Sequence, residues 1–291
     1  MRPRGWSALA LLLAAAAPAA GLRAQATVEC ESPKTGWLWC DDFEQDRLGS
    51  YFEVAAKNGA FVRAAGVGVH GSSGMRARFK KGQIDAGALH LAIGKTPQPY
   101  FRSVTADAGV YRELWWRVWL KLEPGWTGGG GAKLSRATVF SSGAQWAQAA
   151  IAHVWSGGPG NLHLVLDPAR GTSPDGRVVT TRYNDFAKLR WIGSARSVSR
   201  LFAGPVGDGW RCIEAHARLN DPGKANGLFE LRVDGRLEAR RDRLDWVGTY
   251  AEYGWNAVFL ENYWNGGSPK EQERYFDNFV VSTQPIGCGD S

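Results

Sequence analysis

The side chains best suited to chemistry lie between Tyr111 and Lys121, where two kinds of residue alternate strictly. Successive side chains of a strand point to opposite faces of a sheet. One row is apolar and suits a core: Leu114, Trp116, Val118 and Leu120. The other row mixes charge with indole: Glu113, Trp115, Arg117 and Trp119. Because indole stacks on sugar rings and charged groups bind hydroxyls or carboxylates, this row predicts a sugar-binding face. The alternative is that a loop or a second layer covers the tryptophans.

Other segments place polar residues opposite an apolar row in the same way. His153 alternates with Ala152 and Val154, and Trp155 joins the candidates for substrate binding. Two further polar rows follow from alternation, namely Asn161, His163 and Asp167, and then Glu214, His216 and Arg218. The last row has a second interpretation, as a solvated face of a convex sheet.

Familiar catalytic motifs are absent or lack their context. The run Gly66 to Gly71 matches G-x-G-x-x-G, but a strand-like segment, Met75 to Phe79, follows it where a dinucleotide site needs a helix. The chain has no G-x-S-x-G, H-E-x-x-H or C-x-x-C motif. These absences remove the commonest signals for hydrolase elbows, zinc peptidases and thiol redox sites, and nothing indicates an organic cofactor.

The N-terminus predicts export. Arg2 and Arg4 precede an apolar stretch from Ala8 to Ala20, and Ala24-Gln25-Ala26 offers a small-x-small cleavage site. The stretch is too short to span a bilayer, so residues 1–26 are expected to be a signal peptide and the mature chain to be secreted or periplasmic, without membrane insertion. Its removal lowers the formal charge from +7 to +4, because it holds three arginines and no acidic residue. A mild basic bias favours an acidic polymer and does not indicate nucleic acid.

Four cysteines remain, and an even number in an oxidising compartment suggests two disulfides. Three pairings are possible. The favoured one joins Cys30 to Cys40 as a local loop and Cys212 to Cys288 as a link between a central strand and the C-terminus, and free buried thiols are the alternative.

Residues 27–291 favour one large β domain, because strand-like segments recur between turns rich in Gly and Pro and helical periodicity is nearly absent. The expected strands are 74–80, 111–121, 137–141, 149–155, 161–167, 210–220, 228–233, 256–263 and 275–283. Residues 167–209 are predicted to form a long irregular excursion, and such loops often border a site.

The ends of the mature chain carry a resemblance to a known family. Trp37 to Glu44, Trp210 to Asn220, Asn262 to Gly267 and Tyr275 to Thr283 resemble segments of secreted polysaccharide lyase-like proteins of the concanavalin A-like jelly-roll superfamily. The resemblance implies an antiparallel β-sandwich, a concanavalin A-like jelly roll whose terminal strands lie side by side. It also implies a concave sheet that receives a polysaccharide.

On such a scaffold the polar candidates could cleave a uronate polymer by β-elimination. A cation or amide must offset the substrate carboxylate, and Arg117, Lys133 or Asn262 could do so. A base must take the adjacent proton, for which His153 and His163 are equal candidates. Tyr263 could protonate the leaving oxygen.

The adjacent terminal strands suggest a structural calcium ion. They would bring together five oxygen-bearing side chains, Asp41, Asp42, Glu44, Asp277 and Asn278, and hard oxygen ligands suit Ca²⁺. The same residues could instead cap turns or blunt sheet edges.

Two other functions stay open. A glycoside hydrolase needs two suitably spaced carboxylates, but the E-x-D-x-x-E run of laminarinase-like relatives is absent. A non-catalytic carbohydrate-binding or adhesion module needs only the fold and the tryptophans. The sequence therefore predicts a protein that binds or cleaves an anionic polysaccharide, with elimination favoured over binding and hydrolysis third.

Overall fold

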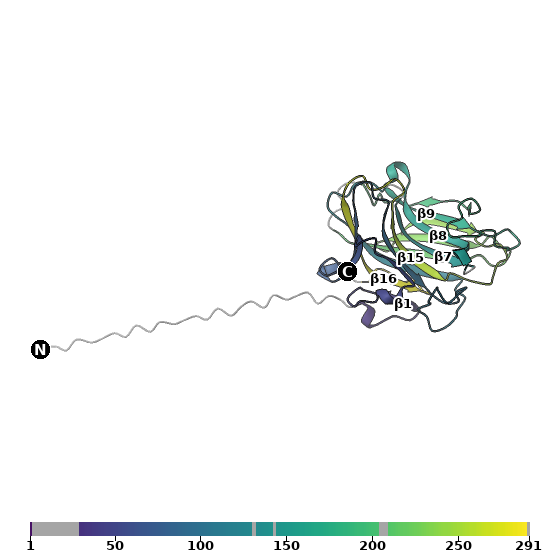
Figure 1. Ribbon diagram of the computed structural model, residues 1–291, viewed down its shortest axis with the longest axis horizontal. Coiled ribbons are helices and arrows are strands. Elements are labelled where there is room, and N and C mark those ends of the chain that lie inside the picture. The colour runs from purple at the N-terminus through teal and green to yellow at the C-terminus, as the bar shows by residue number, and fades with distance from the viewer. Residues whose placement is uncertain (2–28, 130–131, 142–143, 204–208, 290–291) are drawn as a thin grey trace.

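Two antiparallel β-sheets are stacked face to face in the computed structural model, as Figure 1 shows. The structure describes residue 1 and residues 29–129, 132–141, 144–203 and 209–289. The predicted signal peptide and its cleavage site lie almost wholly outside these ranges. The all-β antiparallel sandwich predicted from the sequence is confirmed.

Each sheet contains eight strands. Sheet A runs in the order β14 (Arg236–Leu244), β13 (Gly227–Val233), β12 (Arg211–Arg218), β6 (Glu113–Leu122), β16 (Gln272–Ser282), β4 (Gly74–Phe79) and β3 (Phe61–Ala64), with β1 (Trp37–Asp41) also paired to β16. Sheet B runs in the order β10 (Arg190–Trp191), β9 (His163–Arg170), β8 (Gln148–Gly157), β7 (Lys133–Phe140), β15 (Ala257–Tyr263), β5 (Asp85–Ala92) and β2 (Glu53–Ala55), with β11 (Ala195–Arg196) also paired to β9.

The helical content of the described residues is limited to five 3-10 turns of three residues each: Glu29–Glu31, Leu48–Ser50, Val69–Gly71, Ala144–Trp146 and Pro159–Asn161. No helix in these ranges is long and apolar enough to cross a membrane.

All nine predicted strands are present, with ends shifted by a few residues. Others were missed. The strand β5 has the sequence DAGALHLA, and its Ala and Gly residues are poor strand formers that hide its alternation. The strand β14 carries six charged residues among nine, so it lacks an apolar row of the usual length.

The core lies between the two sheets and takes one row of side chains from each of the longer strands. Trp116, Leu114 and Leu120 of β6 are fully buried there, as alternation predicts. The indole nitrogen of Trp116 donates a hydrogen bond of 3.0 Å to Ser135 on β7, so the polar atom of this large ring is satisfied across the sandwich. The opposite row of each strand must therefore face outward, which is the row that matters for function.

The two ends of the described chain lie side by side, because β1 pairs with β16. The disulfides Cys30–Cys40 and Cys212–Cys288 both form, with Cα–Cα distances of 5.4 and 5.7 Å, which confirms the favoured pairing. The first closes the loop before β1. The second fastens the C-terminal segment to β12 in the middle of sheet A.

Candidate functional site

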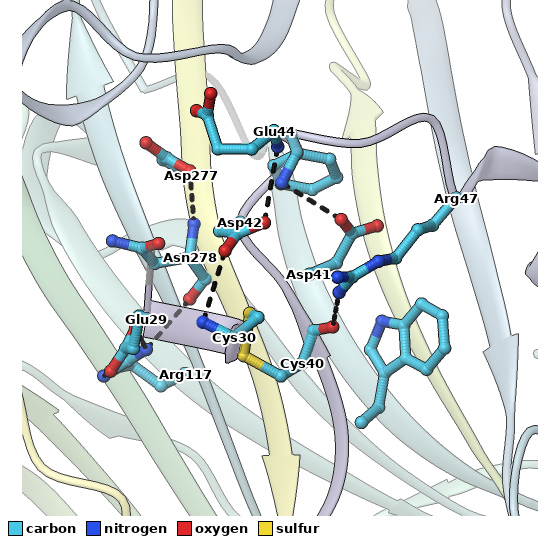
Figure 2. The surroundings of a disulfide bond; sticks show 12 residues. Glu29, Cys30, Cys40, Asp41, Asp42, Glu44, Arg47, Arg117, Asp277 and Asn278 are labelled. Atoms are coloured by element: carbon cyan, nitrogen blue, oxygen red, sulfur yellow. Dashed lines mark hydrogen bonds and ion pairs between the residues drawn. A yellow bond between two sulfur atoms is a disulfide. The ribbon is translucent and has the colours of Figure 1, made fainter. Parts of the chain in front are cut away.

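The charged and aromatic row of β6 does not form an open binding face. Arg117 is fully buried and pairs with Glu29 (Nη1 to Oε1, 2.9 Å), and its guanidinium also donates to the backbone oxygens of Gly287 and Asn278. Figure 2 shows this guanidinium beside the N-terminal turn and the Cys30–Cys40 disulfide. Trp119 is buried against the Cys212–Cys288 disulfide.

The rest of that row is also engaged. Trp115 stacks on His216 with ring centroids 4.0 Å apart, and His216 contacts Glu113 (2.8 Å) and Glu230 (3.2 Å). Burial therefore withdraws Arg117 and Trp119 from any sugar, while Glu113 and Trp115 stay partly exposed beside His216 and their part in substrate binding stays a prediction. The alternation was read correctly, but β6 lies between β12 and β16, where segments from both chain ends cover its outer face.

Glu214 shows how firmly this cover is attached. Its carboxylate accepts hydrogen bonds from the backbone nitrogens of Ile286 (3.1 Å) and Gly287 (2.6 Å) in the C-terminal segment. The row of Glu214 and His216 belongs to this covered sheet and not to an open site.

An open trough of about 530 Å³ lies instead over the outer face of sheet B. Its lining contains cations, carboxylates, amides and a large share of aromatic rings. The chemically distinctive residues are Glu53, Lys57, Asp85, His90, Lys133, Trp155, Tyr183, Asn184, Phe186, Trp191, Glu261, Asn262, Tyr263 and Asn265. Four neighbouring strands, β8, β7, β15 and β5, supply its floor, and the long excursion after β9 supplies one wall.

A buried ionic cluster underlies the floor of this trough. Arg136 of β7 donates to Glu261 of β15 (3.0 Å) and to Asn184 (2.8 Å), and it also contacts the hydroxyl of Tyr183. Lys133 lies 4.0 Å from the same Glu261 oxygen. Burial raises the pKa of Glu261, but Arg136 and Lys133 outweigh that effect and the net direction is downward. The cluster therefore holds a carboxylate, a guanidinium and the amino group of Lys133 close together.

Lys133 and Tyr263 form the pair closest to elimination chemistry. The Lys133 ammonium lies 4.8 Å from the Tyr263 ring centroid, and 37% of Tyr263 is exposed to solvent. Burial lowers the pKa of Lys133, and the positive charge of Arg136 acts in the same direction while Glu261 opposes both. A lysine with a lowered pKa can supply a neutral amine as a base.

Aromatic rings form one wall of the trough. His153 stacks on Trp155 with centroids 4.8 Å apart, and Trp155 lies 5.7 Å from Trp191. Trp191 and Phe186, which stack at 6.2 Å, remain 39% and 48% exposed. Such exposed rings suit stacking against the apolar side of sugars. The excursion that carries Phe186 and Trp191 borders the site, as its length predicts.

His153 itself is almost fully covered. Burial lowers the pKa of this imidazole well below its ordinary value, and the positive charges of Arg136 and Lys133 lower it further. Its 1% exposure places this imidazole behind the aromatic wall and not at the trough surface. Trp155, by contrast, lines the trough.

Two other predicted site residues hold structural positions. His163 lies at the start of β9, where Nδ1 is 2.9 Å from the backbone oxygen of Ser197, and it does not line the trough. Asn262 borders the trough but is fully buried, and its amide contacts Arg274 (2.8 Å) and the backbone oxygen of Gly87 (3.2 Å). The structure thus brings Lys133, Tyr263, Trp155 and Asn262 together and leaves Arg117 and His163 elsewhere.

Sequence reasoning missed several trough residues. His90 of β5 stacks on Phe259 at 3.7 Å, and its Nδ1 lies 3.5 Å from a Glu53 oxygen. Its strand went unrecognised, so His90 could not be assigned to a face. Arg136 lies directly before the predicted strand 137–141, and Glu261 lies within the predicted strand 256–263. A charged residue in an otherwise apolar strand is the signal that could have identified both.

The four carboxylates proposed as calcium ligands accept hydrogen bonds from nearby protein groups. Asp41 accepts hydrogen bonds from Phe43 N and the Tyr51 hydroxyl, both at 3.0 Å, and Asp42 accepts from Cys30 N at 3.2 Å. Figure 2 shows these carboxylates directed to different neighbours.

Asp277 accepts hydrogen bonds from Val69 N (2.7 Å) and Ser72 Oγ (3.1 Å), and Glu44 accepts from Ser73 N (2.7 Å). Across the described ranges, no three His, Cys, Asp or Glu side chains group closely enough to hold a metal ion. This donor set does not fit a metal site built from acidic side chains, and calcium stays a prediction that thermal unfolding with chelator would test.

Comparisons with known proteins place the fold. No family model and no curated protein matches this sequence. Among solved structures, the chain is similar to the alginate lyase vAL-1 from a Chlorella virus (TM-score 0.56, 15% identity, 81% of this chain and 94% of that chain). It is also similar to an endo-β-1,4-glucuronan lyase from the fungus Trichoderma reesei (TM-score 0.58, 11% identity, 85% and 96%). A third is the PL-14 alginate lyase from Aplysia kurodai (TM-score 0.58, 13% identity, 85% and 99%).

Identities this low support the fold alone. The sandwich is that of polysaccharide lyases, which confirms the resemblance at this level, while the finer assignment to the concanavalin A-like superfamily stays a prediction.

Proposed function

We propose that this protein is an exported lyase that cleaves an acidic, uronate-containing polysaccharide by β-elimination in the trough of sheet B. The observation that carries the proposal is the Lys133–Tyr263 pair, which places a lysine of lowered pKa 4.8 Å from an exposed tyrosine ring in an open trough. Two disulfides support an oxidising compartment.

The two residues take complementary roles. The neutral amine of Lys133 removes the proton from the carbon beside the uronate carboxyl group, and that electron pair forms a carbon–carbon double bond as the glycosidic C–O bond breaks. The Tyr263 hydroxyl gives its proton to the leaving oxygen. The products are an unsaturated sugar and a new hydroxyl end.

The carboxylate must be neutralised before its neighbouring proton becomes acidic. Asn184 is suited to this task, because its Oδ1 accepts from Arg136 and its amide nitrogen is left to donate. Asn265 and Lys57 line the same trough and supply further donors. These groups replace Arg117, which is buried in the other sheet.

The aromatic wall supports sugar binding beside this pair. Trp191 and Phe186 offer exposed faces on which a pyranose ring can stack. The fold neighbours include an alginate lyase and a glucuronan lyase, and a uronate polymer as substrate agrees with the chemistry proposed here.

A panel of polymers tests the proposal. The mature protein is incubated with alginate, glucuronan, pectate and glycosaminoglycans, and the ultraviolet absorbance of the unsaturated product is followed. New absorbance with a polyuronate is the expected result. Retention on a polyuronate without any new absorbance would replace the lyase by a carbohydrate-binding module, and new reducing ends without absorbance would indicate a hydrolase.

A further inference from the structure

A second depression lies next to the trough, where sheet B meets the edge of sheet A. It is a groove of about 590 Å³ between the turn that follows β2 and the turn that follows β4. We define the cationic groove by its lining residues: Lys57, Asn58, Gly59, Ala60, Arg78, Lys80, Lys81, Gly82 and Gln83. The lining contains four cations and no carboxylate.

The cationic groove and the trough share a residue. Lys57 lines both depressions, and its ammonium pairs with Asp85 of the trough at 2.8 Å. Gln83 of the groove donates to the backbone oxygen of the same Asp85 at 2.9 Å. Lys57 therefore stands on the border between the trough and the groove, which makes the two depressions neighbours.

The charge of the groove is only partly neutralised. Arg78 pairs with Glu271 and, at 3.9 Å, with Glu273, and Lys57 pairs with Asp85. No ion pair in the described part of the chain involves Lys80 or Lys81, and both are exposed. Lys80 acts on Glu271 only by longer-range attraction, so both ammonium groups remain accessible to an anion.

The turn that carries these lysines is held in place. Lys80 N donates to Gln83 Oε1 (2.9 Å), and Gly82 N donates to the backbone oxygen of Ser268 (2.7 Å) in the loop before β16. Ser268 N donates back to Gln83 O at 3.0 Å. A held turn presents its cations at low entropic cost to a ligand.

We infer that the cationic groove is a remote binding site for a carboxylate-bearing stretch of the same polysaccharide chain whose neighbouring stretch occupies the trough. This inference rests on the proposed function for the identity of the polymer. Its consequence is that long polymers engage both depressions and short oligomers engage the trough alone, which adds affinity for long chains by multivalency.

The test compares the full mature protein with K80Q/K81Q, and K34Q/K224Q serves as the matched control because it removes the same charge from exposed lysines elsewhere. For alginate and for glucuronan, kcat/KM is measured on long polymer and on the tetrasaccharide at low salt. For K80Q/K81Q we expect a loss of about five- to tenfold on the polymer and less than about twofold on the tetrasaccharide, since each exposed charge contributes modestly. The control should leave both values unchanged.

Affinity electrophoresis in gels that contain each polymer separates this inference from the proposed function. If the parent cleaves neither polymer but is retained more strongly than K80Q/K81Q, the result would support binding in the cationic groove and overturn the proposed lyase activity. Cleavage with the same ratio of polymer to tetrasaccharide kcat/KM in the parent and K80Q/K81Q would overturn the groove and leave the lyase standing. Equal retention of the parent and K80Q/K81Q would also overturn the inference that the cationic groove binds the polymer.

Discussion

The outer faces of the two sheets carry similar residues, but one face is covered and the other is open. On sheet A, Arg117 lies beneath segments from both chain ends and has no exposed surface, and Trp115 stacks on His216. On sheet B, Lys133, Tyr263 and Trp191 surround an open trough. A strand with charged and indole side chains on its outward row therefore needs partners for those side chains. The sequence does not reveal whether a ligand or another part of the protein provides them.

The comparison extends to a single pair of residues. Lys121 of β6 lies 5.0 Å from the ring of Tyr275 on sheet A, much as Lys133 lies 4.8 Å from Tyr263 on sheet B. The hydroxyl of Tyr275 donates to Glu273 at 2.8 Å, and burial raises its pKa to about 12. Tyr263 is the one of the two that lines the trough. Variants of the Lys121–Tyr275 pair can therefore serve as controls for variants of the Lys133–Tyr263 pair.

The largest expected effect is on catalysis. K133M and Y263F should each lower kcat on a polyuronate by about 10²- to 10⁴-fold, the usual contribution of a positioned acid or base. The parent kcat should rise with pH through the lowered pKa of Lys133, because the base must be neutral. Steady-state kinetics and thermal unfolding of the same samples provide the measurement.

The matched controls are K121M and Y275F on sheet A, which should leave kcat within about twofold of the parent. Equal losses from both pairs would show that the trough of sheet B is not the site. Unchanged kcat in K133M and Y263F would contradict their assigned roles.

The next effect is on stability. R117M removes a buried guanidinium that contacts Glu29, Gly287 and Asn278, and it should lower the free energy of unfolding by about 3 kcal/mol. Denaturant titration measures this loss, and R117M/E29M should recover part of it because no carboxylate is left unpaired. At temperatures below the melting temperature of R117M, the kcat of this variant should equal that of the parent. A folded R117M without activity would return the site to sheet A.

The alternation of β6 was predictable from the sequence, and so were the nine strands and the disulfide pairing. The neighbours of β6 were not, because a period of two assigns a residue to a face without naming the sheet or its cover. What buries Arg117 is Glu29, 88 positions away in sequence, and the backbone of the C-terminal segment. Contacts of this range carry no local signal.

The trough was predictable only in part. Lys133, Tyr263 and Trp155 were identified as candidates from residue type and position. His90 was missed because its strand is rich in Ala and Gly, and Asn184 was missed because it lies in an irregular excursion with a positive φ of 50°. Residues of irregular loops obey neither a period of two nor one of 3.6, so their direction comes only from the folded chain.

The cover of sheet A should depend on its disulfide. C212S/C288S frees a loop closed across 76 residues and should lower the free energy of unfolding by about 2–4 kcal/mol. C30S/C40S, which opens a loop of only 10 residues, should lose about 1–2 kcal/mol less. Denaturant titrations compare the two variants. If C212S/C288S also gained sugar binding on sheet A, the cover would be a removable lid and not a permanent part of the fold.

The smallest expected effect concerns pH and the corner that holds β1 against β16. Burial raises the pKa of Asp277 to about 7, despite hydrogen bonds from Val69, Asn278 and Ser72, and Glu44 raises it further. Burial likewise raises the pKa of Asp41 to about 6, which Phe43 and Tyr51 oppose. The folded state therefore prefers both carboxyl groups protonated.

Since the folded pKa of Asp277 exceeds its unfolded value of 3.8, its contribution to stability is complete below that value and is lost as pH rises through about 7. The parent should thus lose about 2–3 kcal/mol more than D277N between about pH 5 and about pH 8. The difference between the two proteins isolates Asp277 from His153, whose lowered pKa acts in the opposite direction below about pH 6.5. Parallel curves for the parent and D277N would mean that the Asp277 carboxyl group ionises without cost, as it would beside a bound cation, and would favour the calcium prediction for this corner.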